Sequence, residues 1–447
     1  MKRSHTPLWS GLAFVATLLL LAGAATASTI TVPNGASGGT CGASNPNRYE
    51  FGGSCGSLVN ITDTNPAYVQ DNSPAAEGTY RVRFYANFGG KSSVAPPANA
   101  PAVSLSMASG NAFDFFVAYD GADPAPPAAG GNAVIRVELG QSSATTRTIK
   151  FAARLNNGTE ATFSRSLIGK ALRGWRAIEI NWAKASTPSG SNGVLQAWID
   201  GVQVGNLTNL ANGNQVVNMV RWGAVAGIDS GTSGTFKLDD FVSQRSGYIG
   251  PALPFSDVAQ SSPFFPEIQS IHHAEIIPPV SPGTFNPTGM ITRKEMAKYL
   301  LTASENTGYT PPACTTPTFN DVPCSHPYAA WIYELVRRDI TAGCSSSPPN
   351  YCPDNPVTRQ QMVVFIQRTN LVPEPPACGG GNPSGFADVP NASTFCPWIN
   401  KAISTGLTVG CATGPPALFC PGDNVGRQAM ATFIRKEFAL PFIAVGP

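Results

Sequence analysis

The second half of the chain contains an internal repeat, and this repeat constrains the fold more than any other feature. The phrase Phe-x-Asp-Val begins at Phe255, Phe319 and Phe386, so that successive copies start 64 and 67 residues apart. Each copy continues with an apolar stretch of helical period, a loop rich in Gly and Pro, and a second helical stretch. A period of this length predicts repeated supersecondary units that bury their apolar faces against one another.

The second helical stretches of the three copies align closely. Each has an apolar stripe at i, i+3 and i+4, which lies on one face of a helix. The stripe residues are Met296, Tyr299 and Leu300, then Met362, Phe365 and Ile366, then Met430, Phe433 and Ile434. Thr292 with Glu295, and Thr358 with Gln361, have the spacing of capping boxes. The third copy has Gly426 at the cap position, which predicts a weaker helix start.

An arginine follows the cap position in every copy, at Arg293, Arg359 and Arg427. A cation there faces the positive end of the helix dipole, at a cost of about 0.3 to 1 kcal/mol. Local structure does not require these arginines, so their repetition indicates a site for an anion, because a guanidinium can bind a carboxylate through two hydrogen bonds. The alternatives are solvation or an ion pair inside the fold with the aspartates of the opening phrases.

Those aspartates are Asp257, Asp321 and Asp388. Aspartate is a favoured helix N-cap, so we predict that each one caps the turn into the first helix of its copy.

Ten cysteines form five close pairs in the sequence. The pairs are Cys41 with Cys55, Cys314 with Cys324, Cys344 with Cys352, Cys378 with Cys396, and Cys411 with Cys420. Their even number and close spacing, together with the N-terminal segment described next, predict disulfides and an oxidising compartment. No C-x-x-C motif occurs and histidines are few, so we predict no metal site formed by these cysteines.

The N-terminus reads as a targeting segment. Lys2 and Arg3 precede an apolar run, and residues 25–27 fit an A-x-A cleavage site. We therefore predict a secretory signal peptide at residues 1–27 and a secreted chain, with an uncleaved anchor as the alternative. No later stretch reaches the ~18 apolar residues that a membrane span needs. A balance of 29 basic and 27 acidic residues argues against a nucleic-acid partner.

Residues 28–247 predict an all-β domain, because short runs rich in β-branched and aromatic residues alternate with Gly, Asn, Ser and Pro clusters. The expected strands are 79–88, 112–121, 133–140, 147–155, 176–184 and 194–204. Asp200-Gly201 inside the last run has the pattern of a two-residue hairpin turn. A Gly- and Pro-rich segment at 248–254 is predicted to be a linker.

The repeated phrases resemble S-layer homology repeats. The resemblance rests on Phe-x-Asp-Val, on Trp331-Ile332 and Trp398-Ile399 in the first helices, and on the Thr-Arg-x-Glu/Gln-Met phrase. It places repeats at 255–310, 311–373 and 374–440 and implies an α-helical module held non-covalently to a cell-wall or surface polysaccharide. It also implies that Arg293, Arg359 and Arg427 contact an anionic glycan. The chain departs from the family in its cysteine-bearing loops, in Gly426, and in a first helix without tryptophan.

The first half resembles concanavalin-A-like and laminin-G-like jelly rolls. The matching stretches are GWRAIEINW (174–182), LQAWIDGVQV (195–204), VRWGAVAG (220–227) and GTFKLDDFVSQR (234–245). Trp198 lies on the more polar face of its strand, which suits either a sugar-stacking platform or a second buried face. Asp239 and Asp240 are the candidate ligands for a structural Ca²⁺ ion; no other cofactor is expected.

The function expected from these features is a secreted, non-catalytic protein of the cell envelope or cell surface. The repeats would bind an anionic polysaccharide, and the β domain would bind a glycan or a protein. The alternative is a polysaccharide hydrolase or lyase with its catalytic site in the β domain. Against it, Glu179 has no partner carboxylate at catalytic spacing in its strand. Self-association into a lattice is a third interpretation.

Overall fold

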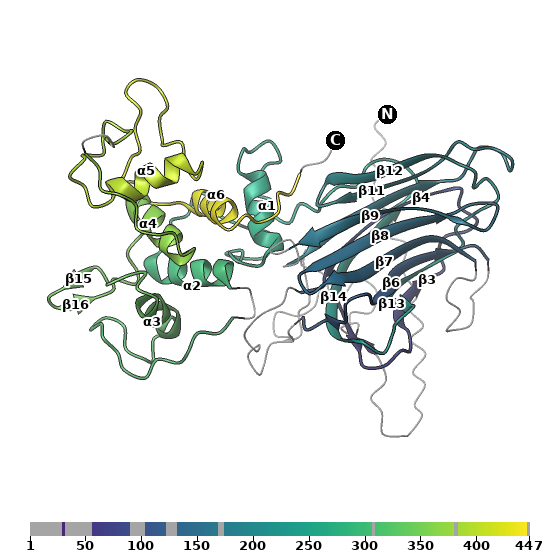
Figure 1. Cartoon of the computed structure of the whole chain (residues 1–447), viewed down its shortest axis with the longest axis horizontal. Helices are drawn as coiled ribbons and strands as arrows, with labels where there is room; N and C mark the ends of the chain where they lie inside the picture. The colour runs from purple at the N-terminus through teal and green to yellow at the C-terminus, as the bar shows by residue number, and fades with distance from the viewer. Residues whose placement is uncertain are drawn as a thin grey trace, which may run out of the picture. The chain divides into compact units, whose positions relative to one another are not determined.

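The computed structural model describes residues 29–31, 56–89, 103–121, 132–168, 174–305, 309–379 and 383–444. The predicted signal peptide at 1–27 lies outside these residues. The chain divides into two compact parts, a β-sandwich that ends at Ala252 and a helical module that begins at Leu253 (Figure 1).

Two antiparallel sheets pack face to face in the β-sandwich. The first, sheet A, has the order β1 (Thr29–Thr31), β2 (Ser57–Ile61), β14 (Thr232–Gln244), β4 (Thr79–Asn87), β10 (Arg176–Ala183), β11 (Gly193–Ile199) and β12 (Val202–Leu210), and β5 (Ser106–Met107) pairs with β14. The second, sheet B, has the order β3 (Ala67–Asp71), β13 (Met219–Ala226), β6 (Ala112–Tyr119), β7 (Ala133–Ser143), β8 (Thr146–Arg154) and β9 (Glu160–Ile168).

The predicted all-β domain is thereby confirmed as a β-sandwich. Its core lies between the sheets, where Phe84 of β4 stacks on Phe116 of β6 with ring centroids 5.5 Å apart. The predicted hairpin between β11 and β12 is also present: Asp200 and Gly201 have φ values of 55° and 77°, as a type I′ turn requires.

The described residues of the helical module form six helices, two in each of the predicted repeats, which we call units one, two and three. They are α1 (Phe265–His273), α2 (Arg293–Ser304), α3 (Ala329–Arg337), α4 (Arg359–Thr369), α5 (Cys396–Ser404) and α6 (Arg427–Glu437). All nine residues of the predicted stripes on α2, α4 and α6 are buried. Within the described residues, no helix is long and apolar enough to cross a membrane.

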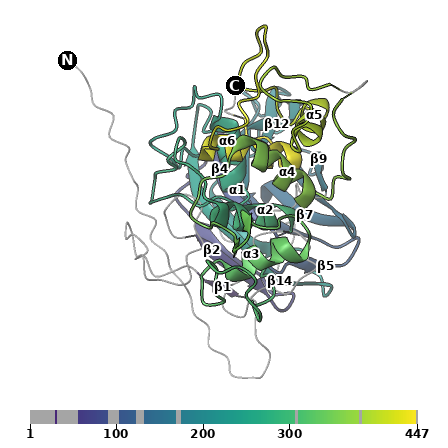
Figure 2. The same ribbon diagram turned by 90° about the vertical axis from the view of Figure 1, so that its left-hand side faces the viewer.

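The closest helix pairs join different units. The second helix of each unit packs on the first helix of the next, so α2 contacts α3 and α4 contacts α5. The last helix, α6, returns to pack on α1, and this contact closes the three units into a ring. Figure 2 shows α1, α2, α4 and α6 gathered in the middle of the module.

Backbone hydrogen bonds run around the same ring. The amide of Ile291 donates to the carbonyl of Val425, Val425 donates to Val357, and Val357 donates to Ile291, over N···O distances of 2.8 to 3.0 Å. All three residues are buried and directly precede the caps of the second helices. The chain segments that lead into these helices therefore hold one another in place.

The aspartate of each Phe-x-Asp-Val phrase has a different role from the predicted one. The first helices begin eight residues after the aspartates, too far for capping, and their N-cap residues form no side-chain cap bond. Instead, Asp321 accepts hydrogen bonds from the backbone amides of Tyr351 and Cys352, at 2.8 and 2.7 Å. Asp257 and Asp388 accept from the equivalent amides in units one and three. The aspartates thus fix the loop that leads into the second helix.

Four of the five predicted disulfides lie within the described residues, and all four are confirmed. They are Cys314–Cys324, Cys344–Cys352, Cys378–Cys396 and Cys411–Cys420. The fifth predicted disulfide, between Cys41 and Cys55, is not confirmed. Cys41 and Cys55 both lie outside the described residues, so this pairing stays a prediction.

Two of the disulfides hold the turn before a second helix. Cys352 and Cys420 occupy equivalent left-handed positions in units two and three, with φ of 59° and 56°. Unit one has Asn286 there, with φ of 57°, and Asn tolerates this conformation better than most residues. A disulfide therefore holds this turn in units two and three, whereas in unit one an asparagine that tolerates the left-handed conformation occupies the same position.

We predict that Asp321→Ala destabilises the helical module by about 3 kcal/mol, because two backbone amides lose a charged acceptor. Urea denaturation followed by far-UV circular dichroism measures the loss. The matched control is Asp354→Ala, whose side chain is 74% exposed and pairs with Lys294 at the surface; it should leave the stability close to that of the wild type, because surface ion pairs contribute little. Equal effects of the two substitutions would contradict the assigned role of Asp321.

Candidate functional site

The second helices begin as the sequence predicts. In unit one, Thr292 and Glu295 form a capping box, in which the Glu295 carboxylate accepts from the Thr292 amide at 2.9 Å. In unit two, the side-chain carbonyl of Gln361 accepts from the Thr358 amide at 3.2 Å. In unit three, Gly426 supplies no side-chain cap. Each cap residue places an arginine on the first turn of its helix.

Each arginine crosses to the next unit of the ring. The Nε atom of Arg293 donates to the carbonyl of Tyr351 at 2.8 Å, and the guanidinium lies over the Tyr351 ring at 4.7 Å. Arg359 makes the same two contacts with Phe419, at 2.9 and 5.0 Å. Arg427 makes them with Phe285 of unit one, at 2.7 and 4.7 Å. The three arginines therefore mark three equivalent junctions between units.

The first-turn amides of these helices are also engaged across the junctions. The amide of Arg293 donates to the carbonyl of Asn355 at 3.0 Å, and the amide of Lys294 donates to that of Pro353 at 2.9 Å. The first-turn amides of unit two donate in the same way to the loop of unit three, and those of unit three donate to the loop of unit one. Because carbonyl oxygens of the neighbouring unit occupy the positive end of each helix, those ends are not open anion sites.

The hypothesis that local structure does not require the arginines is therefore wrong. Arg293 and Arg427 are 3% and 4% exposed, and Arg359 is half-buried. Burial lowers the pKa of both Arg293 and Arg359 from the ordinary arginine value. The alternative of an ion pair with Asp257, Asp321 or Asp388 is not realised either, since those carboxylates accept from backbone amides.

The Nη2 atom of the arginine has different surroundings at the three junctions. In Arg427, Nη2 donates to the carbonyl of Pro278 at 2.5 Å. In Arg293 and Arg359, Nη2 is buried and has no hydrogen-bond partner within the described part of the chain. Two of the three guanidinium groups thus keep an unused donor, and Arg359 is the more exposed of these two.

The first residues of the predicted linker, 248–252, lie against the outer face of sheet A, and we call them the strap. The carboxylate of Glu179 accepts hydrogen bonds from the amides of Ile249 and Gly250, at 3.0 and 2.8 Å. It also pairs with Nε of Arg81 at 2.5 Å. Further along, the amide of Ala252 donates to the Tyr85 hydroxyl at 2.8 Å. Glu179 is 2% exposed, so this carboxylate is committed to holding the strap.

The structure contradicts an open sugar-stacking platform at Trp198. The indole is 6% exposed and lies edge-on to Tyr248 of the strap, with ring centroids 5.6 Å apart. The Arg81 guanidinium lies over the same indole at 4.6 Å. Trp198 therefore belongs to a second buried face, the alternative that its strand position left open.

The two candidate calcium ligands lie where β14 is irregular. Asp240 has φ of 50° and its carboxylate pairs with Nη1 of Arg83 at 2.5 Å, while the Asp239 carboxylate accepts from the Asp240 amide at 2.7 Å. Within the described ranges, no group of three or more His, Cys, Asp or Glu side chains could hold a metal ion. Because the Asp240 carboxylate is paired with Arg83, it is less available to bind a metal cation.

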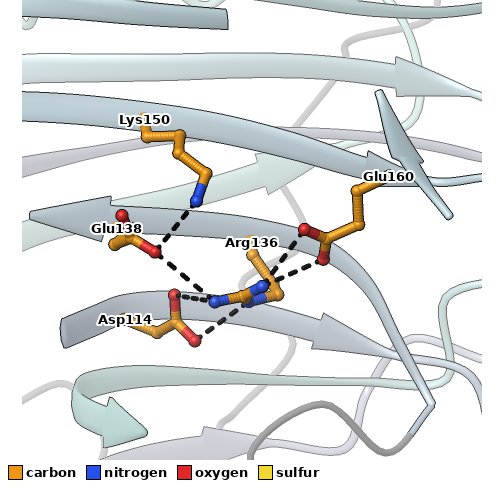
Figure 3. A network of polar contacts seen from close by, with 5 residues as sticks. All are labelled: Asp114, Arg136, Glu138, Lys150 and Glu160. Carbon is orange, nitrogen blue, oxygen red and sulfur yellow. Dashed lines mark hydrogen bonds and ion pairs between the residues drawn. The ribbon is translucent and has the colours of Figure 1, made fainter. Parts of the chain in front are cut away.

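The outer face of sheet B carries a cluster of charges around Arg136 (Figure 3). Its guanidinium binds both oxygens of Asp114, at 3.0 and 3.1 Å, and both oxygens of Glu160, at 3.0 and 3.2 Å. Glu138 lies 3.6 Å from Nη2 of Arg136 and accepts from Lys150 at 3.1 Å. Three carboxylates against two cations leave the cluster with a formal charge of −1.

Burial raises the pKa of Asp114, although Arg136 donates two hydrogen bonds to it. Glu138 and Glu160 keep 22% and 30% of their side chains exposed. A buried carboxyl group with a raised pKa beside two partly exposed carboxyl groups is an arrangement from which general acid–base chemistry can be built.

Sequence reasoning missed this cluster. Its members come from four strands, β6 to β9, and only the strand register brings Asp114 opposite Glu138. The alternation of Arg136 and Glu138 with the core residues Val137 and Leu139 was the available signal for their outward position. That signal shows a polar face but cannot show that one guanidinium joins three carboxylates.

Residues 254–297 match the S-layer homology domain family. The match covers unit one from its Phe-x-Asp-Val phrase to the first turns of α2. A "Cell surface protein" of Thermoanaerobacter kivui is 35% identical over 124 residues, which are 28% of this chain and 16% of that protein. An "Endoglucanase" of Bacillus sp. (strain KSM-635) is 27% identical over 186 residues, 41% of this chain and 18% of that protein. The matched segments span less than a fifth of either relative.

Similar solved structures include the "Botulinum Neurotoxin Type G Receptor Binding Domain". It has a TM-score of 0.26 and 10% identity, over 42% of this chain and 38% of that one. The ligand-binding domain of botulinum neurotoxin serotype D has a TM-score of 0.24 and 10% identity, over 43% and 37% of the two chains. At these TM-scores the likeness carries no further conclusion.

We predict that Glu179→Gln releases the strap. The substitution leaves the buried Arg81 without a carboxylate partner, which should cost about 3 kcal/mol. Hydrogen exchange at the amides of Ile249 and Gly250 should accelerate, and urea denaturation gives the loss of stability. Glu77→Gln removes a half-exposed partner of Arg245 and is the matched control, with an expected cost below about 1 kcal/mol. Unchanged exchange at residues 249 and 250 would rule out Glu179 as the anchor of the strap.

Proposed function

We propose that this chain is a secreted cell-surface protein that three S-layer homology repeats anchor, without a covalent bond, to an anionic cell-wall or surface polysaccharide. The observation that carries the proposal is the threefold repetition of one contact set. Unit one, which matches the family, shares with units two and three its aspartate contacts and its arginine junction. The proposal therefore extends the family assignment to all three units.

Several further features support a surface location. The four disulfides suit an oxidising compartment, and the N-terminal sequence has the pattern of a secretory signal peptide. The relative named "Cell surface protein" is similar over 28% of this chain. In this proposal the β-sandwich, a jelly roll, is the displayed part and binds a glycan or a protein.

The arginines join the units and also bind the polymer. Since Arg293 and Arg359 keep an unused Nη2 donor, each can donate to a carboxylate of the polysaccharide once that group reaches the junction. The Nη2 atom of Arg427 already donates to the carbonyl of Pro278, so Arg427 contributes less to polymer binding. Arg359 is the most exposed of the three residues, but its Nη2 atom is buried, so this contact requires the junction to open.

The anchoring proposal is tested by co-sedimentation of the full chain with purified envelope polysaccharide. Binding that falls as salt rises is expected, because the recognised groups are charged. The same polymer with its acidic groups removed should bind weakly. A chain that stays in the supernatant with every envelope polymer tried would overturn the proposal.

We predict that Arg359→Lys weakens polymer binding about tenfold, since an ammonium keeps the charge but loses the planar fork that binds a carboxylate. Titration calorimetry measures the affinity, and thermal unfolding reports whether the junction survives. The matched control is Arg337→Lys, at an arginine whose side chain is 62% exposed. Wild-type affinity in a folded Arg359→Lys chain would show that the arginine does not touch the polymer.

A second candidate function is a surface-anchored polysaccharide hydrolase or lyase. The cluster around Arg136 favours it, because Asp114 has a raised pKa and two partly exposed carboxylates lie on the same sheet face (Figure 3). The relative named "Endoglucanase" is consistent with this candidate over the part that it shares. Under this candidate Glu179 is excluded as the catalytic group, since it is buried and holds the strap.

For this candidate we predict that the full chain releases reducing ends or unsaturated products from a polysaccharide, and that Asp114→Asn and Glu160→Gln each lower the rate at least about 100-fold. Assays against a polysaccharide panel measure the turnover. The control is Glu77→Gln, at a carboxylate that pairs with Arg245 and is not a member of the cluster. Turnover that survives both substitutions places the chemistry elsewhere, and an inactive chain on every substrate leaves the binding function as the conclusion.

A further inference from the structure

The strap covers a set of charged and aromatic side chains on the outer face of sheet A. These are Arg81 of β4, Glu179 of β10 and Trp198 of β11, and all three are buried. Their strand neighbours, such as Val82 and Ile180, belong to the core of the sandwich, so the three side chains point to the opposite face. A sheet face built from buried arginine and glutamate is unusual, and the strap is the segment that this face holds.

The strap lies on this face as a bound peptide would. The amides of Ile249 and Gly250 donate to the two oxygens of Glu179, at 3.0 and 2.8 Å. The ring of Tyr248 lies edge-on to Trp198. Among the described residues, 248–250 share no backbone–backbone hydrogen bond with the sheet. Side chains of the sheet therefore hold the strap by its main chain and one aromatic ring, and they can hold the same segment of another chain.

Two hydrogen-bond donors under the strap lack acceptors. The Arg81 guanidinium lies over the rings of both Trp198 and Tyr248, at 4.6 and 5.1 Å. Its Nη2 atom is buried and has no hydrogen-bond partner in the part of the chain that the structure describes, and the same is true of the Tyr248 hydroxyl. A buried polar group of this kind costs about 1 to 3 kcal/mol. Water satisfies both groups when the strap lifts, so the covered state is stabilised less than its contacts alone indicate.

A short turn at residues 245–247 joins the end of β14 to the strap. The turn is exposed at Ser246 and Gly247, and a side-chain hydrogen bond from Nε2 of Gln244 to the carbonyl of Gly247, at 2.8 Å, spans it. Gly247 has φ of 83°, and a glycine can leave this conformation for an extended one without steric cost. The strap can therefore lift about this turn while β14 keeps its place in the sheet.

We propose that two copies of this chain associate by exchanging their straps, so that residues 248–252 of each copy lie on the outer face of sheet A of the other. A second copy is the partner that fits, because it presents the same tyrosine ring and the same two amides to Arg81, Trp198 and Glu179. The exchanged pair keeps every contact that the strap makes in the closed chain, and its two equal interfaces form a closed dimer of twofold symmetry. This inference goes beyond the anchoring function and does not depend on it, since it concerns the β-sandwich and needs no polysaccharide.

The experiment mixes full chains that carry two different affinity tags, measures how much of one form co-purifies with the other, and determines the mass by light scattering. Glu179→Gln removes the acceptor of the strap, and Tyr248→Ala removes its ring. A mixture of these two variants still contains one intact pair, the strap of the first and the sheet face of the second. We expect the wild type to co-purify with itself, and this mixture to give at least about tenfold more co-purification than either variant with itself. Glu374→Gln, at an exposed glutamate of the helical module, should behave as the wild type does.

A synthetic peptide of residues 246–254 gives a test that needs no folded variant. In excess over the wild type, it should compete for the sheet face and lower co-purification, whereas the same peptide with Tyr248→Ala should not. A wild type with the mass of a monomer up to its solubility limit would overturn the proposal, as would a peptide without effect or a mixture that co-purifies no better than its components. Glu179→Gln chains that co-purify with each other as well as the wild type would also overturn it, because association would then involve another surface.

Discussion

The helical module depends on three carboxylates, those of Asp257, Asp321 and Asp388. Each accepts two consecutive backbone amides from the loop before a second helix, and so fixes where that helix starts. With the start fixed, the arginine of the first turn reaches the aromatic residue of the next unit. The stripe of the same helix then packs on the first helix of that unit. One repeated interaction thereby sets both the junctions and the ring.

In the proposed function, each arginine therefore has two roles: it joins two units and it binds the polymer. Their Nε atoms and ring contacts join the units, which requires burial, whereas polymer binding requires access. Within the described residues, Nε is bound in all three arginines, whereas the buried Nη2 atom has no partner in two of them, so the proposed contact requires the junction to open. Loss of an arginine would change junction and ligand contact together, which is why the lysine substitution is more informative than alanine.

Much of the fold could be predicted from sequence because its signals are local. The helical stripes, the caps at Thr292 and Thr358, the Asp200-Gly201 turn and the short-range disulfides each depend on residues close together in the chain. The strap was missed for the opposite reason. Glu179 and Ile249 are far apart in sequence, and a Gly- and Pro-rich segment reads as a linker whether or not a distant carboxylate holds it. The partners of the arginines and the cluster around Arg136 likewise depend on register and on contacts between units, which no local pattern records.

Because α6 packs on α1, the order in which the helices are synthesised limits when the module can finish folding. The ribosome makes α1 before α6, and these two helices pack on each other, so the ring cannot close until unit three has been made. The module therefore cannot be completed one unit at a time, and its folding waits for contacts distant in sequence, which form slowly. Among the described helices, closure of the ring is therefore the last step that the order of synthesis allows.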